Sequence, residues 1–460
     1  MTQNTFFGDG ILKKTDILYL IALMLIIYIC FSVLTPSYDH EAFPSSNETS
    51  KEGLVSGINL ESSEQRDDIQ NEDSLVHTEK LNSVNEIHRD DLSVLQDDFF
   101  SEINRSIPTN AEPSINARSA VVMDFETGTL LYTKNAFRKR PMASTTKIMT
   151  AIIALEYCSL DEDVLISKRA ANMGGSVMGI KAGTTLKLND LLHGMLICSG
   201  NDAAVAIAEH IGGSIEGFSE IMNRKAVEIG AFSTNFSNPH GLDAENHYST
   251  AYDLAKITRY ALNIPEFDEI VRKKEFYFNG RVLKNTNEML DLYEGADGVK
   301  TGYTGLAGRC LITSATKKDM RLISVVLFCD TKNLRTSSSM KILDYSFAEY
   351  DSIKLLDKGT IMGSIKVKRS RTSQEIDLSV SSDLSAVLRH NQKDMLFTRV
   401  SIPETVTAPV KKGSIMGTVS VYHGDRIIAE TSLIAMNSAE KKELKDYIME
   451  VFIEWSKILG

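Results

Sequence analysis

Three short motifs in this sequence combine hydroxyl, amine and amide groups at spacings that suit nucleophilic catalysis. In chain order they are Ser144-Thr-Thr-Lys147, Ser199-Gly-Asn201 and Lys300-Thr301-Gly302. A serine hydroxyl is a weak nucleophile until a neighbouring base takes its proton. Each motif alone is a weak signal, because such short patterns occur by chance in chains of this size. Their order and settings together predict one shared site.

Ser144 and Lys147 are the predicted nucleophile and base. Residues 144–156 have the apolar pattern of a buried helix, so Lys147 would lie one turn after Ser144 on the same face. Lys147 can accept a proton only if its amine is largely neutral. Burial and a second cation both lower the pKa of a lysine, and Lys300 is the candidate cation. The helix N-terminus also offers backbone N–H groups to a developing oxyanion. The rival interpretation, a capping serine beside a solvated lysine, would be preferred for an isolated motif.

The other two motifs are predicted to bind substrate and to pass a proton. Ser199 follows an apolar run and suits a loop between helices, from which its hydroxyl could relay a proton to a leaving amine. Asn201 would hold a substrate amide. Lys300 and Thr301 would bind a terminal carboxylate, and Gly302 would let a substrate backbone lie against a strand edge.

The elements around these motifs predict an α+β domain over residues 115–350. Two hairpins are expected, one over 119–133 and one over 310–328. Two helices are expected within 189–230, where glycines interrupt the pattern, and another over 337–350. Strands at both ends with helices between them predict a mixed layer of helices and strands in which the first and last strands share one sheet.

Residues 351–436 change to short strand patterns with an internal repeat. The segment KGTIMGSIKV at 358–367 is echoed by KGSIMGTVSV at 412–421. Two glycine-containing β units of the same design predict a small all-β domain with pseudo-repeat symmetry.

The last segment, residues 437–460, predicts an amphipathic helix. Asn437 and Glu440 have the spacing of a capping box. The apolar residues that would share one face are Leu444, Ile448, Val451, Phe452, Trp455 and Leu459. The charges of this segment nearly balance, which is a poor match to an anionic bilayer.

An apolar run near the N-terminus predicts a membrane anchor within residues 1–36. Residues 17–34 carry no charge, and their number reaches the lower limit for spanning a bilayer. Lys13 and Lys14 precede the run, so the positive-inside rule places the rest of the chain outside the cytoplasm. An uncleaved single-pass anchor in membrane lipid is preferred to a cleaved signal peptide, because no small-x-small cleavage site follows.

Residues 37–114 are predicted to be a disordered acidic linker. They contain 18 Asp and Glu against 5 Lys and Arg and few aromatic residues, within a chain of net charge −11. Such a segment buries too little apolar surface to offset its ordering entropy. The acidity argues against a nucleic-acid partner.

Four cysteines follow the anchor, and none has the spacing of a metal site. They are Cys158, Cys198, Cys310 and Cys329. No CxxC or Cys/His pattern surrounds them, so free packed thiols are expected, with no metal and no cofactor.

Around these motifs the sequence resembles the low-molecular-mass penicillin-binding proteins, the serine D-Ala-D-Ala carboxypeptidases. The stretches that carry the resemblance are RPMASTTKIMTA (140–151), GTTLKLNDLLHGMLICSGNDAA (183–204), NPHGLDAENHYSTAYDLA (238–255) and DGVKTGYTGLAGRCLITSA (297–315). The resemblance implies a transpeptidase fold of the penicillin-binding and β-lactamase type, followed by the family's β-rich domain and terminal helix. His240 belongs to the family pattern and is interpreted as structural.

The resemblance also implies a reaction. The enzyme would remove the terminal D-alanine from peptidoglycan stem pentapeptides through an acyl-enzyme on Ser144. Lys147 would be the base, Ser199 and Asn201 the second element, and Lys300, Thr301 and Gly302 the substrate clamp. β-Lactam antibiotics would be covalent inhibitors. Two alternatives stay open: a β-lactamase, although no loop with a water-positioning Glu is recognisable, and a β-lactam sensor or scaffold without turnover.

Overall fold

The structure is a computed structural model that describes Met24 and residues 112–390, 392 and 396–459. Apart from Met24, the predicted anchor lies outside these residues, as does nearly all of the predicted linker. Within the described ranges, no helix combines the length and the apolar character needed to cross a membrane.

A five-stranded sheet forms the centre of the domain that carries the three motifs. Its strand order is β2-β1-β9-β8-β7. The strands are β1 Ser119–Asp124, β2 Leu130–Lys134, β7 Ala296–Thr304, β8 Gly308–Lys317 and β9 Met320–Cys329. All neighbours are antiparallel, and β1 pairs directly with β9. The prediction that the first and last strands share one sheet is therefore confirmed.

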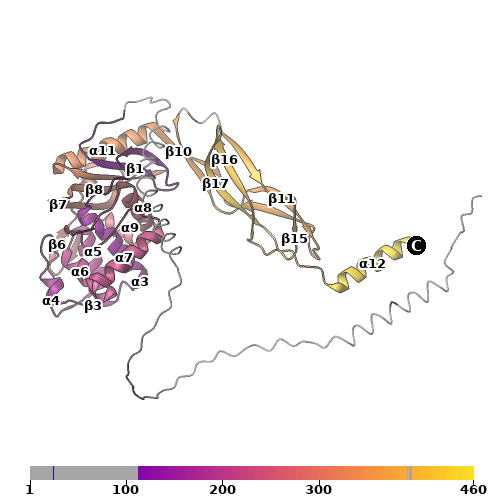
Figure 1. Ribbon diagram of the computed structural model, residues 1–460, viewed down its shortest axis with the longest axis horizontal. Coiled ribbons are helices and arrows are strands. Elements are labelled where there is room, and N and C mark those ends of the chain that lie inside the picture. Colours follow the sequence, from indigo (N-terminus) through magenta and orange to yellow (C-terminus); the bar gives the residue numbers. More distant parts are fainter. Residues whose placement is uncertain (1–23, 25–111, 391, 393–395, 460) are drawn as a thin grey trace, which may run out of the picture. The chain divides into compact units, whose positions relative to one another are not determined.

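Helices cover both faces of this sheet (Figure 1). They are η1 Ala143–Thr146, α3 Lys147–Tyr157, α4 Lys168–Ala171, α5 Leu188–Ile197, α6 Asn201–Gly212, α7 Ile215–Ile229, α8 Ala251–Leu262, α9 Pro265–Val271, α10 Met289–Leu292 and α11 Lys332–Glu349. Two small hairpins complete the domain: β3 Asp163–Leu165 with β4 Thr185–Lys187, and β5 Glu275–Phe278 with β6 Arg281–Lys284.

The strands bury both faces, with alternate residues in different cores. On β1, Val121 and Met123 join the core under α3, α5 and α6. Ala120 and Val122 join a second core with residues of α11. This period of two is what a strand imposes on its side chains. The sheet is therefore a middle layer between a large helical layer and α11.

The prediction of two helices within 189–230 is wrong, because three form there. The break between α5 and α6 is only three residues long and contains Ser199 at a φ of 66°. The second break consists of Gly213, whose backbone is in the left-handed region, and Ser214. The Ser214 hydroxyl accepts the Gly217 N–H and so caps the start of α7. Breaks this short leave little trace in an apolar pattern.

A second, β-rich part follows α11. Strands β10 Tyr350–Leu356 and β13 Leu384–Arg389 form one pair. A six-stranded sheet has the order β14-β16-β17-β12-β11-β15. Its strands are β11 Ile361–Lys368, β12 Glu375–Val380, β14 Leu396–Ser401, β15 Thr405–Thr407, β16 Ile415–His423 and β17 Arg426–Ala435. The predicted all-β domain is confirmed.

The internal repeat has a structural counterpart in this sheet. The register shifts between Ile361 and Gly363 on β11, and at the matching positions Ile415 and Gly417 on β16. Both glycines lie against Ile402, so an added Cβ would come within 3.0 Å of its Cδ1 at Gly363 and within 3.3 Å of its Cγ1 at Gly417. The repeated glycine therefore marks the same irregular step in two strands.

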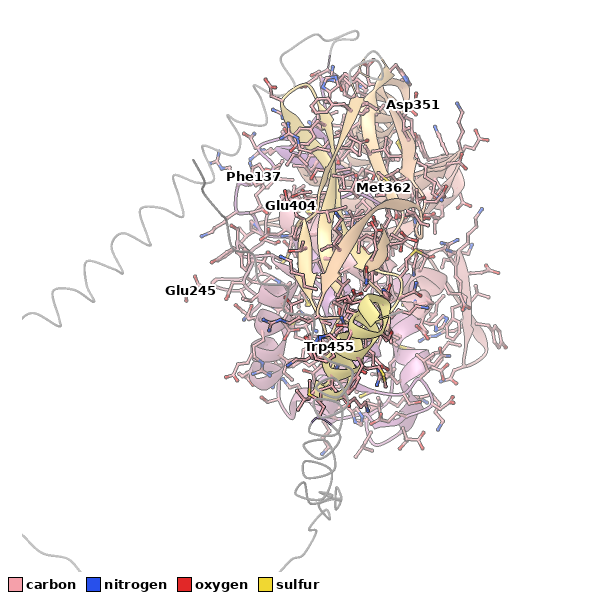
Figure 2. The ribbon with its side chains drawn as sticks, turned by 90° about the vertical axis from the view of Figure 1, so that its right-hand side faces the viewer. Phe137, Glu245, Asp351, Met362, Glu404 and Trp455 are labelled. Atoms are coloured by element: carbon pink, nitrogen blue, oxygen red, sulfur yellow. The ribbon has the colours of Figure 1, made fainter. Side chains whose placement is uncertain are left out.

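The terminal helix α12 spans Leu444–Leu459, so the predicted capping box at Asn437 is wrong. Before the helix, Ala439 exchanges two backbone hydrogen bonds with Val410 and is buried in the β-domain core. Because of this pairing the chain around Ala439 is extended, and the helix begins only at Leu444. Most apolar side chains of α12 are exposed, including Trp455 (Figure 2).

Candidate active site

Ser144 lies in the short helix η1, which continues into α3 at Lys147. This arrangement puts the Lys147 Nζ 3.0 Å from the Ser144 Oγ. Gly241 packs closely against this turn. A Cβ at position 241 would lie 1.9 Å from the carbonyl oxygen of Ala143, which explains the glycine. Lys147 thus lies within direct proton-transfer distance of the predicted nucleophile.

Lys147 is fully buried and donates to three oxygens. Besides the Ser144 Oγ, these are the Asn201 Oδ1 at 2.7 Å and the main-chain oxygen of His240 at 2.6 Å. The three acceptors favour the ammonium form, whereas burial opposes it. Burial and, second, the positive charge of Lys300 hold the pKa of Lys147 well below its ordinary value.

Lys300 is the second buried lysine of the site. Burial lowers the pKa of Lys300 to about 7. Its Nζ donates to the main-chain oxygen of Thr301 at 3.1 Å. The positive charge of Lys300 opposes a second positive charge on Lys147, so of the two amines Lys147 is the one suited to be neutral. Lys300 remains partly charged near neutral pH.

The strand β7 brings the third motif beside Ser144. It is an edge strand of the sheet, so among the described residues no further strand pairs with its outer side, and an extended peptide could add there. A Cβ at Gly302 would lie 3.0 Å from the Ser144 backbone nitrogen, which explains glycine there. The Thr301 hydroxyl shares a hydrogen bond of 2.7 Å with the Thr286 hydroxyl.

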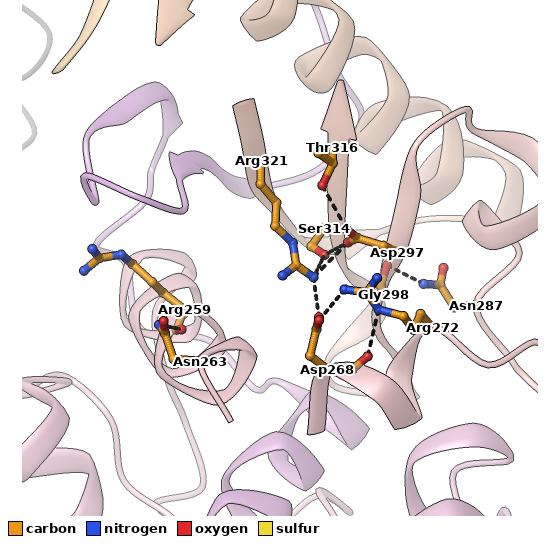
Figure 3. A network of polar contacts seen from close by, with 10 residues as sticks. All are labelled: Arg259, Asn263, Asp268, Arg272, Asn287, Asp297, Gly298, Ser314, Thr316 and Arg321. Atoms are coloured by element: carbon orange, nitrogen blue, oxygen red, sulfur yellow. Dashed lines mark hydrogen bonds and ion pairs between the residues drawn. The ribbon is translucent and has the colours of Figure 1, made fainter. Parts of the chain in front are cut away.

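A network of charged residues fixes the start of β7 (Figure 3). Arg321 bonds both Asp268 on α9, at 2.5 Å, and Asp297 on β7, at 3.1 Å. The Asn287 side chain donates to the main-chain oxygen of Gly298 at 2.8 Å. These contacts hold the strand only a few residues before Lys300.

The second motif spans the break between α5 and α6. Ser199 is buried, and its neighbour Cys198 interacts electrostatically with both Lys147 and Lys300. Both ends of the Asn201 side-chain amide bond protein groups. Its Oδ1 accepts from the Lys147 Nζ, and its Nδ2 donates to the Gly174 oxygen at 2.7 Å. The structure therefore brings all three motifs together.

Sequence reasoning missed Asp202, which fixes a loop beside the site. Its carboxylate accepts the backbone N–H groups of Met178, Gly179 and Ile180 at 2.9, 2.7 and 3.2 Å. The loop, residues 172–184, contains no Asp or Glu. The three backbone donors have no sequence signature, so only the acidic residue next to the motif hinted at this role.

Two buried histidines, His240 and His247, lie in the segment between α7 and α8 and contact residues beside the nucleophile. The His247 Nδ1 accepts the Ser237 N–H, so its Nε2 carries the proton and meets the Thr146 hydroxyl at 2.8 Å. Burial lowers the pKa values of His240 and His247 to about 3 and about 4. Both are neutral at physiological pH, and the His240 Nδ1 accepts the Leu242 N–H at 3.1 Å. These contacts agree with the structural interpretation of His240.

Comparison with known proteins assigns the family. Residues 107–331 match the model of the peptidase S11 family, described as D-alanyl-D-alanine carboxypeptidase. The D-alanyl-D-alanine carboxypeptidase DacF of Bacillus subtilis is 34% identical over 75% of this chain and 92% of its own length. The chain belongs to this family. DacC of Escherichia coli is likewise 34% identical, over 75% of this chain and 90% of its own length.

The family assignment extends to the β-rich part and to the fold. Residues 350–441 match the C-terminal domain of penicillin-binding protein 5. A crystal structure of penicillin-binding protein 5 from Haemophilus influenzae is 32% identical and covers 72% of this chain and all of that one, with a TM-score of 0.66. The resemblance drawn from the sequence is confirmed, as is the transpeptidase fold followed by a β-rich domain and a helix. The protein is a serine-type D-Ala-D-Ala carboxypeptidase.

Proposed function

We propose that this carboxypeptidase acts through Ser144 as nucleophile and Lys147 as its base. One observation carries the proposal: a buried amine with a strongly lowered pKa lies 3.0 Å from the serine hydroxyl. A base with these properties can take the hydroxyl proton at neutral pH. The backbone N–H at the start of the helix stabilises charge on the attacked carbonyl oxygen.

The proposed reaction has two halves. In acylation, Lys147 takes the Ser144 proton, the Oγ bonds to the carbonyl carbon of the penultimate D-alanine, and the bond to the terminal D-alanine breaks. Ser199 relays that proton from Lys147 to the leaving amine, which returns Lys147 to its neutral form, while Asn201 orients the substrate amide. In deacylation, water attacks the ester with Lys147 again as base, and Ser144 regains its proton.

Recognition of the substrate is proposed to lie on β7. A terminal carboxylate beside Lys300 and Thr301 would meet a buried cation and a hydroxyl, which together bind an anion strongly. Binding the carboxylate would also raise the pKa of Lys300 and keep it charged. Gly302 leaves the backbone of β7 open to the extended peptide.

The test is a comparison of two substrates on the same enzyme. We expect D-alanine release from a pentapeptide ending in D-Ala-D-Ala to exceed benzylpenicillin hydrolysis by several orders of magnitude, each worth ~1.4 kcal/mol of barrier. Departure of D-alanine makes room for water at the ester, whereas the tethered ring nitrogen of an opened β-lactam blocks that space. The loop 172–184 also lacks a carboxylate to position water.

Two outcomes would contradict this expectation. Faster hydrolysis of penicillin than of the pentapeptide would make the protein a β-lactamase. Stable acylation by penicillin without any release of D-alanine would make it a sensor or scaffold.

We also propose that the chain is held at the membrane by residues 17–34, with the enzyme outside the cytoplasm. The uncharged run and the lysines before it support this topology. Deleting residues 1–36 is expected to release most of the protein from membranes, because α12 is too weakly basic to retain it alone. Fractionation with antibody detection measures this. N-terminal sequencing of the mature protein that begins near residue 37 would refute the uncleaved anchor.

A further inference from the structure

Three side chains that the proposed reaction does not use converge on one surface of the helical layer. They are Cys158, Glu162 and His210, and their ligand atoms all lie within 4.8 Å of one another. The His210 Nε2 and the Glu162 Oε1 are 2.8 Å apart. Cys158 and Glu162 lie in the turn between α3 and β3, whereas His210 lies in α6. Cys158 and His210 are 52 positions apart, so the spacing of the full set in the sequence gave no indication of a site.

The backbone under each of the three residues is fixed. Cys158 directly follows the last residue of α3, and its N–H donates to the Ala154 oxygen at 3.2 Å. Glu162 precedes β3, and its carbonyl accepts the Leu188 N–H at 2.9 Å. His210 lies in the last turn of α6. Ligands carried by packed elements need little reorganisation to bind an ion.

We propose that Cys158, Glu162 and His210 form a binding site for a divalent transition metal, with Zn²⁺ the best-fitting ion. A thiolate, an imidazole and a carboxylate are a ligand set of zinc, with water as the fourth ligand. Mg²⁺ and Ca²⁺ prefer oxygen ligands only, so they fit poorly. Donor atoms on one tetrahedral zinc lie about 3.4–3.6 Å apart, as bond lengths of about 2.0–2.3 Å require. Small rotations of the three side chains would reach that spacing.

Binding has a simple proton balance. The Cys158 S–H bond breaks, a sulfur–metal bond forms, and the proton passes to solvent. The metal takes the place of the hydrogen bond between His210 and Glu162, in which the imidazole Nε2–H donates. That Nε2 proton therefore also leaves, and in the neutral ring it passes by way of solvent to Nδ1, so that Nε2 can bind the metal. Burial and the charge of Glu162 raise the pKa of the Cys158 thiol to about 11, so the thiol is unreactive until a cation arrives. A bound dication reverses that electrostatic effect.

The position of the site indicates what the metal would do. Helix α3 begins at Lys147 and ends beside Cys158, and α6 begins at Asn201 and ends near His210. Each helix is about 16–18 Å long, so the metal would lie at the ends opposite the active site. It would join the two helices that carry the base and its amide partner. We therefore expect an effect on stability and none on the chemical step.

The competing interpretation is that His210 and Glu162 are a surface pair at a helix C-terminus, where a cationic histidine is favourable. That pair needs no thiol. The chain offers a matched control, because the His390 Nδ1 lies 2.8 Å from the Asp351 Oδ2 in another histidine–carboxylate pair. Among the described residues, His390 does not belong to a group of side chains that could hold a metal ion.

The experiment titrates the full-length, untagged protein in detergent with Zn²⁺ against a chromophoric chelator, and repeats it with Co²⁺ as a spectroscopic probe. We expect one zinc per chain, a cobalt–thiolate charge-transfer band in the near ultraviolet, and a higher melting temperature with zinc. Cys158→Ala and His210→Gln should each weaken binding at least about 100-fold, as loss of a ligand does. His390→Gln should bind zinc as the parent does.

Three results would overturn the proposal. The first is zinc binding that neither Cys158→Ala nor His210→Gln weakens. The second is a cobalt complex without the thiolate band, and the third is no binding at all to the parent chain. Circular dichroism and D-alanine release of each variant show that it is folded. Because release does not depend on the metal, failure of this proposal is separate from failure of the catalytic one.

Discussion

Replacing Ser144 by alanine is expected to abolish both D-alanine release and covalent labelling by a fluorescent penicillin. Both reactions need the same Oγ, because the acyl group is transferred to it before water can attack. Removing a catalytic serine costs on the order of 10⁴-fold or more in kcat, equivalent to about 5.5 kcal/mol of barrier. Gel fluorescence measures labelling, and a D-alanine oxidase assay measures release.

The fold should survive this substitution. Ser144 is only partly buried, and Lys147 keeps two of its three acceptors, Asn201 and the His240 oxygen. A matched control is Ser337→Ala on α11, a helix of the opposite layer, which should label as the parent does. Labelling that persists in Ser144→Ala would remove Ser144 as the nucleophile.

Periodicity predicted the sheet well and the helix boundaries poorly. Strands β1 and β2 form one predicted hairpin and β8 and β9 form the other, because short continuous apolar runs bounded by turn residues are typical of strands buried on both faces. Helix α11 begins at Lys332, five residues before the predicted start. The Thr331 hydroxyl caps it by accepting the Leu334 N–H. Its first turn is polar, so an apolar pattern could not reveal that turn.

The motifs predicted which residues meet but not what holds them. The proximity of Ser144 and Lys147 follows from helical spacing within one segment. The oxygen that Lys147 meets at His240 is a main-chain atom 93 positions away, and any residue type could supply it. The same holds for the three N–H groups bound by Asp202. Contacts through the backbone depend on tertiary packing, so a single sequence carries little information about them.

The two buried lysines should respond differently to the same substitution. Lys147→Arg is expected to lower the rates of penicillin acylation and D-alanine release by on the order of 10³-fold or more, because a guanidinium cannot give up its proton at working pH. Lys300→Arg keeps the cation that is proposed to bind the carboxylate, so it should lose much less activity. Stopped-flow acylation and steady-state release measure both effects.

The pH profile of the parent enzyme gives a second measure of the two roles. Lys147 must be neutral, so activity rises with pH as this lysine, whose pKa burial lowers, loses its proton. Lys300 must be charged, so kcat/KM falls as the pH passes its pKa of about 7. In the substrate complex the bound carboxylate keeps Lys300 charged, so kcat should fall only at higher pH.

Lys300→Arg therefore should move the falling limb of kcat/KM to higher pH and leave the rising limb in place. Lys147→Arg has no corresponding rescue at any pH that the fold tolerates. Equal losses in the two variants, with an unchanged falling limb in Lys300→Arg, would contradict the assignment of charge to Lys300. If the acylation rate of Lys147→Arg stays within about tenfold of the parental rate, the role of Lys147 as base is contradicted, because a tenfold loss is only ~1.4 kcal/mol of barrier. The two variants have the same added bulk in a buried site, so a difference between them reports the protonation state that each position needs.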